Sequence, residues 1–157
     1  MRKGNERILM EIVRLQKEHC EILAELEKLC FSHPWSQRAI EDEVHNSNAY
    51  FVTAVDGDKI LRYGGMHCTH QECYVDNIAV LPAHRGKGIG RALTASLIGR
   101  AQADGGAFIT LEVRASNRPA VLLYTSLGFE QAGVRRNFYT APREDALIFT
   151  LRFAAQP

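Results

Sequence analysis

The chain has 157 residues, a length that predicts one domain able to bury about two-thirds of its unfolded surface. Lys and Arg together number 19, Asp and Glu number 18, and 46% of the residues are hydrophobic. This composition excludes a chain that is disordered throughout. The near-neutral charge argues against a dedicated nucleic-acid-binding protein, which needs a basic surface, so we expect no direct nucleic-acid partner.

Several features of the sequence predict a cytoplasmic protein without membrane contact. No apolar run approaches the roughly 20 residues that a membrane-spanning helix requires. Glu11 and Arg14 interrupt the apolar stretch that follows the charged first residues, which argues against a signal peptide. Residues 1–9 are expected to be a flexible extension of a single domain that spans residues 1–157.

The four cysteines form no CxxC pair, and a chain of this length needs no disulfides to fold. Reduced thiols are therefore expected at Cys20, Cys30, Cys68 and Cys73. The segment 67–73 also carries two histidines, but strand alternation places His67 and Cys68 on opposite faces. Its spacing matches no zinc signature, so we expect no metal site and a plain solvent-facing hairpin there.

The amino-terminal half predicts a strand, two helices and three strands. The residues from Ile8 to Leu15 alternate loosely, as a strand would. A helix follows, because one face of a 3.6-residue period is formed by Ile22, Leu23, Leu26, Leu29 and Cys30. Ser36 is placed to cap a second helix that ends near Asn46. Three strands are then expected at 49–55, 59–69 and 73–80, with a hairpin turn at 56–58.

The carboxyl-terminal half alternates between helices and strands. A glycine-rich segment at 85–91 leads into a helix that ends near Asp104, before a Gly-Gly pair. The apolar strand at 107–113 contains one carboxylate, Glu112. Pro119 suits the first turn of a helix that ends at Leu127, and strands follow at 129–139 and 146–153. The order β-α-α-β-β-β-α-β-α-β-β predicts an α/β fold of one mixed sheet with helices on its faces.

The glycine-rich segment has the properties of a diphosphate-binding loop. Its glycines let the backbone approach a ligand, and its amides precede a helix N-terminus, which favours anions. Positive charge is added by Arg85, Lys87 and Arg91. A dinucleotide fingerprint would need glycine at position 91, and a Walker A loop would need glycine at position 81. The loop alone is also compatible with an exposed turn that carries ordinary surface charges.

Four segments of the chain carry a family resemblance: Asn77-Ile78-Ala79-Val80, the glycine-rich segment, Leu111 to Asn117, and Leu123-Tyr124-x-x-Leu127-Gly128-Phe129. Together they resemble the GNAT acetyltransferase superfamily, and more narrowly the bacterial ribosomal-protein-alanine N-acetyltransferases. The resemblance extends from about Ile12 to Leu151. It implies a GNAT fold, in which a mixed, mostly antiparallel sheet is splayed between two central parallel strands with helices on both faces.

The resemblance implies acetyl-CoA as co-substrate, bound between the strands at 74–80 and 107–113. The pantetheine arm would lie on the backbone of Ile78, Ala79 and Val80, much as an added strand would. The pyrophosphate would lie beside Arg85, on the amides of Gly86, Lys87, Gly88, Ile89, Gly90 and Arg91. Asn117 would contact the cofactor, although its position suits a plain helix cap as well.

Two residues match the family's catalytic groups. Glu112 would be the general base, because an N-terminal amine with a pKa of about 7.7–8.0 is mostly protonated at pH 7. An unpaired carboxylate is costly to bury, so a structural ion pair with Arg114 or Arg135 is the alternative. Tyr124 would be the general acid that protonates the CoA thiolate; a core aromatic is its alternative. No cysteine is assigned as an acyl carrier.

The acceptor is implied to be a protein N-terminus, above all the N-terminal alanine of a small-subunit ribosomal protein. Phe31, Trp35 and Tyr139 would line its groove. Lysine side chains or small amines are alternative acceptors, and a catalytically silent acyl-CoA-binding module is an alternative function. The sequence departs from close relatives at Phe138 and Thr140, where tyrosine and proline are frequent, and at Arg62, where small residues are frequent.

Overall fold

The computed structural model describes residues 10–80 and 88–154, with the backbone alone for residues 77–80. It contains one seven-stranded sheet. The strands are β1 (Met10–Arg14), β2 (Ala49–Asp56), β3 (Lys59–Thr69), β4 (Glu72–Val80), β5 (Phe108–Arg114), β6 (Glu130–Thr140) and β7 (Arg143–Arg152). The α-helices are α1 (Cys20–Cys30), α2 (Gln37–Val44), α3 (Ile89–Ala103) and α4 (Arg118–Ser126). This order confirms the element order that the sequence predicts.

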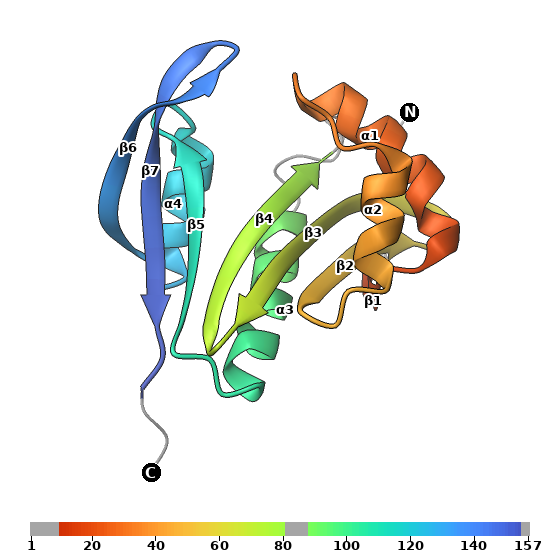
Figure 1. Cartoon of the computed structure of the whole chain (residues 1–157), viewed down its shortest axis with the longest axis horizontal. Coiled ribbons are helices and arrows are strands. Elements are labelled where there is room, and N and C mark those ends of the chain that lie inside the picture. Colours follow the sequence, from red (N-terminus) through yellow and green to blue (C-terminus); the bar gives the residue numbers. More distant parts are fainter. Residues whose placement is uncertain (1–9, 81–87, 155–157) are drawn as a thin grey trace, which may run out of the picture.

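The sheet is splayed at its centre. The strand order is β1-β2-β3-β4-β5-β7-β6, and only the β4–β5 pair is parallel. That pairing covers three residues of each strand, from Glu72 to Tyr74 against Phe108 to Thr110. Beyond this point the two strands diverge (Figure 1). The predicted mixed, mostly antiparallel sheet with two splayed parallel strands is therefore confirmed.

The helices lie on both faces of the sheet, with α1 and α2 on one face and α3 and α4 on the other (Figure 1). Each face has its own hydrophobic core. One core contains Leu93 and Leu97 of α3 together with inward-facing residues of β5. The other joins α1 and α2 to Phe51 and Tyr63. No helix within residues 10–80 and 88–154 is long and apolar enough to cross a membrane.

The buried face of α1 differs from the predicted one. Leu23 and Leu26 are buried, but Ile22 and Leu29 are 51% and 69% exposed. The buried stripe is instead Cys20, Leu23, Ala24 and Glu27, an i, i+3, i+4, i+7 pattern. The carboxylate of Glu27 accepts a hydrogen bond from the Tyr63 hydroxyl. A pattern based on apolar residues alone could not predict this buried face, because Glu27 is part of it.

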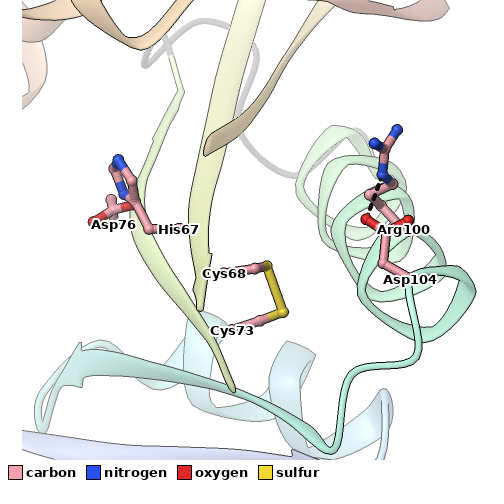
Figure 2. Close-up of a disulfide and its surroundings, with 6 residues drawn as sticks. All are labelled: His67, Cys68, Cys73, Asp76, Arg100 and Asp104. Atoms are coloured by element: carbon pink, nitrogen blue, oxygen red, sulfur yellow. Dashed lines mark hydrogen bonds and ion pairs between the residues drawn. A yellow bond between two sulfur atoms is a disulfide. The ribbon is translucent and has the colours of Figure 1, made fainter. Parts of the chain in front are cut away.

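The β3–β4 hairpin contradicts two expectations. Cys68 and Cys73 face each other across the hairpin, with Cα atoms 4.2 Å apart, and form a disulfide (Figure 2). The turn residues His70 and Gln71 both have positive φ, the two-residue turn geometry that sets this register. Reduced thiols were therefore the wrong prediction for this pair, although Cys20 and Cys30 keep their thiols. The hairpin is not plainly solvent-facing either, because Cys73 is buried in the core.

We predict opposite stability effects for two glycine substitutions. Gly65 lies across from Phe51 in the sheet, and a methyl group added at Gly65 would overlap that buried ring. Gly65→Ala should therefore lower the free energy of unfolding by about 1–3 kcal/mol, the usual cost of overpacking. Gly99→Ala, in an open part of α3, should raise it by up to about 1 kcal/mol. Urea unfolding measures both changes, and an unchanged midpoint for Gly65→Ala would contradict this packing.

Candidate active site

A cleft of about 380 Å³ opens where β4 and β5 diverge. It receives Asp76 from β4, Glu112 from β5 and Arg135 from β6. Because side chains alternate along a strand, Glu112 points away from its neighbours Leu111 and Val113, which are buried with the α3 core. Glu112 therefore projects into the cleft on the face of the sheet that carries α1 and α2.

The Glu112 carboxylate forms an ion pair in the cleft. Its Oε1 lies 3.0 Å from Nε of Arg135, and the two side chains are 32% and 57% exposed. Arg114, the other arginine considered from the sequence, pairs with Glu144 at 3.3 Å instead. The ion pair with Arg135, which the sequence analysis gave as the structural alternative for Glu112, is therefore formed. An ion pair this exposed contributes little stability, so it does not by itself explain a carboxylate at this place.

Tyr124 lies on the opposite face of β5. It is 7% exposed and belongs to the same core as Leu111 and Val113. Its ring packs edge-to-face on Phe129, with centroids 5.7 Å apart. Burial raises the pKa of the Tyr124 hydroxyl, and the positive charge of Arg62 opposes that rise. The aromatic ring is thus a core residue, and the hydroxyl remains protonated at neutral pH, as a proton donor must be.

The first turn of α3 supplies the described part of the glycine-rich segment. Gly88 caps the helix with a φ of +76°, which glycine adopts at little cost. A methyl group added at Gly90 would overlap the guanidinium of Arg62. This contact accounts for the unusual arginine, because the glycine leaves the space that Arg62 fills. Arg91 donates a 2.7 Å hydrogen bond from Nη2 to Ser126 Oγ and links α3 to α4.

The remaining predicted cofactor residues have different outcomes. Arg85, Gly86 and Lys87 lie outside the described residues. The backbone of Ile78, Ala79 and Val80 pairs with β3, on the edge of β4 that faces away from β5. Asn117 caps α4, since its side chain accepts a 3.3 Å hydrogen bond from the amide of Ala120. The cap is confirmed, whereas the contact of Asn117 with the cofactor stays a prediction.

Two segments that are distant in the sequence contact each other. Ser32 Oγ donates a 3.4 Å hydrogen bond to the carbonyl of Ala141. His33 Nε2 lies 3.4 Å from Thr140 Oγ1. The loop after α1 and the β6–β7 turn are therefore in contact, and in the sequence each contacting segment directly follows a predicted acceptor residue, Phe31 or Tyr139. The threonine that replaces the family's usual proline makes one of these contacts.

The three predicted acceptor residues occupy different surroundings. Phe31 and Trp35 are half-buried against the α1–α2 core, and the Trp35 ring lies 6.0 Å from that of Phe51. The half-buried Tyr139 lies beneath the guanidinium of Arg114, 4.2 Å from its ring centroid. Burial and then the Glu112 charge raise the pKa of Tyr139. Among the three, Tyr139 is thus the one with an electrostatic connection to Glu112.

The sequence analysis missed a chain of three hydrogen-bonded side chains beside the cleft. His67 Nε2 lies 2.7 Å from Glu43 Oε2 on α2, and its Nδ1 contacts Asp76 Oδ2 on β4. Burial alone would lower the pKa of His67, but the two carboxylates outweigh it and raise the pKa. Strand β4 carries two carboxylates, Glu72 and Asp76, and only the contact with His67 distinguishes Asp76 from its neighbour in the strand.

Comparisons with known proteins place this fold and cleft in a family. A model of the acetyltransferase (GNAT) family matches residues 20–129. The ribosomal protein bS18-alanine N-acetyltransferase of Escherichia coli strain K12 is 38% identical over 128 residues, which cover 80% of this chain and 86% of that protein. An uncharacterized Mycobacterium leprae protein is 39% identical over 131 residues, 80% of this chain but 36% of that longer protein.

A solved structure supports the same conclusion. The crystal structure of the ribosomal-protein-S18-alanine N-acetyltransferase from Escherichia coli superposes with a TM-score of 0.86 at 32% sequence identity. The superposition covers 95% of this chain and 97% of that one. The chain belongs to the GNAT family of acetyltransferases. Within that family it is an acetyl-CoA-dependent N-acetyltransferase.

Proposed function

We propose that this enzyme transfers the acetyl group of acetyl-CoA directly to the α-amino group of a protein N-terminus. The acceptor we propose is the N-terminal alanine of a small-subunit ribosomal protein of the bS18 type. The observation that carries the proposal is the position of Glu112, in a cleft between the two splayed parallel strands. The acceptor is supported by similarity to enzymes named for that reaction. Such a reaction would take place in the cytoplasm.

The binding of acetyl-CoA follows from the divergence of β4 and β5. Beyond Tyr74, the edge of β4 that faces β5 has no ladder partner in β5, so its backbone groups are available to the pantetheine arm. The pyrophosphate would lie at the N-terminus of α3, where the amides of the glycine-rich segment would donate to it and the helix dipole favours negative charge. Asn117, at the start of α4, would reach the cofactor from the other side.

The two proposed catalytic groups act from opposite faces of β5. Glu112 removes a proton from the ammonium group of the acceptor, and the neutral amine then attacks the thioester carbonyl. The resulting tetrahedral intermediate releases its second nitrogen proton to solvent as it collapses, which breaks the carbon–sulfur bond and forms the amide. Tyr124 donates its proton to the departing CoA thiolate. Because the thioester would pass through the opening between the strands, one group can reach the amine while the other reaches the sulfur.

The proposed acceptor is tested with a panel of synthetic peptides and acetyl-CoA, read by mass spectrometry. Peptides that begin with alanine should gain one acetyl group at the α-amine. The same peptides with a blocked N-terminus and an internal lysine should gain none. Acetylation of the lysine with an untouched α-amine would contradict the proposal and favour the lysine-directed alternative.

The role of Glu112 is tested by Glu112→Gln, which keeps the shape of the side chain and removes its basicity. General base catalysis contributes roughly 10²–10⁴-fold, so kcat at pH 7 should fall by about that factor while acetyl-CoA affinity changes little. The loss should shrink as the pH rises above the amine pKa of about 8, because the amine then deprotonates without help.

A variant of Arg135, the ion-pair partner of Glu112, distinguishes a catalytic role of Glu112 from a structural one. Arg135→Gln breaks the contact with Glu112 but leaves the carboxylate in place, so it should lower kcat far less than Glu112→Gln. Equal losses in the two variants, matched by equal losses of thermal stability, would mean that the pair is structural.

The role of Tyr124 is tested by Tyr124→Phe, which preserves the buried ring and its packing on Phe129. The melting temperature should barely change, whereas kcat should fall more than acetyl-CoA affinity. Tyr50→Phe is a matched control, because its hydroxyl lies 3.5 Å from Ser96, outside the cleft lining. A normal kcat in Tyr124→Phe would contradict its role as the general acid. A stable acetylated cysteine that passes its acetyl group to added peptide would contradict direct transfer.

A further inference from the structure

The imidazole of His67 joins three elements at the cleft. It lies on β3, contacts Glu43 of α2 through Nε2 and contacts Asp76 of β4 through Nδ1. Figure 2 shows His67 and Asp76 close together on one side of the hairpin, with the disulfide on the other side. The side chains of His67, Glu43 and Asp76 are 29%, 15% and 26% exposed. Both ring nitrogens are occupied, so the ring orientation and the position of the Asp76 carboxylate are fixed together.

This arrangement is a hydrogen-bonded chain and not a metal site. Each ring nitrogen of His67 already faces a carboxylate oxygen. Among residues 10–80 and 88–154 there is no group of three or more His, Cys, Asp or Glu side chains arranged to hold a metal ion. The chain ends at Asp76, which lines the same cleft as Glu112 but from the opposite strand.

The charges around the cleft differ between its two walls. On the β5 side, Glu112 is paired with Arg135, and Arg152 also lines the cleft. On the β4 side, the single imidazole of His67 lies between the two carboxylates of Glu43 and Asp76, so acidic groups outnumber basic ones in that chain. The β4 wall is therefore the side with an excess of negative charge.

The proposed acceptor enters this cleft with a positive charge. An N-terminal amine has a pKa of about 7.7–8.0, so most of it is ammonium at pH 7. An ammonium group moved out of water needs a charged hydrogen-bonding partner. Glu112 shares its carboxylate with Arg135, and the carboxylate of Asp76, which His67 holds in place, supplies a second acceptor on the other wall of the cleft.

We propose that Asp76 is a specificity-determining residue that binds the ammonium form of the acceptor's α-amino group, with His67 and Glu43 as positioning residues. Asp76 accepts hydrogen bonds from the ammonium group across the cleft from Glu112, which then removes the proton. The proposal rests on the proposed function, since it assigns the amine-binding group of that same cleft. It selects for acceptors with a free, charged terminus over those with a blocked one.

The test measures binding separately from turnover. The probes are an alanine-initiated hexapeptide with a free amine and the same peptide with an acetylated amine, titrated into the enzyme with CoA by calorimetry. The wild type should bind the free-amine peptide at least about tenfold more tightly, the value of one hydrogen bond to a charged group. Asp76→Asn, which can still accept a hydrogen bond from His67, should lose most of this preference. Its KM for peptide should rise with kcat little changed.

Two further variants make the result specific. Glu72→Gln removes a carboxylate from the same strand that is not in the cleft lining, where it accepts a hydrogen bond from Tyr74, and it should keep the full preference. His67→Gln leaves Asp76 in place without its charged partner, so it should weaken the preference partially. It also keeps the proposal testable if Asp76→Asn fails to fold. The His67 imidazole pKa, measured by NMR, should fall in Asp76→Asn.

The outcomes separate this proposal from the proposed function. If the wild type acetylates peptides and Asp76→Asn keeps its KM and its preference for the free amine, the role of Asp76 is overturned and the function stands. If the free-amine preference depends on Asp76 but no peptide is acetylated, the function fails and the amine site stands. Loss of the preference in Glu72→Gln as well would overturn the proposal in favour of general surface charge.

Discussion

The short parallel pairing of β4 with β5 is the constraint on which the site depends. Hydrogen bonds join the two strands from Glu72 to Tyr74 only, while each strand remains paired along its other edge with an antiparallel neighbour. The opening therefore lies between the two antiparallel halves of one sheet, each of which is held by its own ladder. A backbone edge left unpaired inside a protein calls for a ligand that can hydrogen-bond to it.

The alternation of side chains along β5 then decides which face of the sheet each proposed catalytic group lies on. Along β5 the residues that face α3 and α4 are apolar and buried, and the residues between them face the cleft. Glu112 and Tyr124 are consequently separated by the sheet, one on each side of the opening. The proposed general acid, Tyr124, lies in a core where burial raises the pKa of its hydroxyl, whereas the proposed general base, Glu112, is partly exposed in the cleft.

Sequence reasoning predicted the order of elements and the splayed sheet, because periodicity, caps and glycine turns are local signals. It failed where a long-range contact changes the meaning of a residue. Glu27 lies in the buried stripe of α1 because Tyr63, on a distant strand, supplies its hydrogen bond. Cys68 and Cys73 became partners once a two-residue turn set their register. Asp76 shares its strand with a second carboxylate, Glu72, and its contacts with His67 and, through it, with α2 follow from no spacing in the sequence.

The contact between the loop after α1 and the β6–β7 turn has a steric consequence for any polypeptide substrate. Side chains about 107–109 positions apart in the sequence touch there, at the wide end of the opening between β4 and β5 (Figure 1). Two side-chain contacts therefore tie the amino-terminal and carboxyl-terminal halves of the chain together at this end of the molecule. If the acceptor enters from this end, a free chain terminus would meet less obstruction than the middle of a chain, which would have to enter as a folded-back loop.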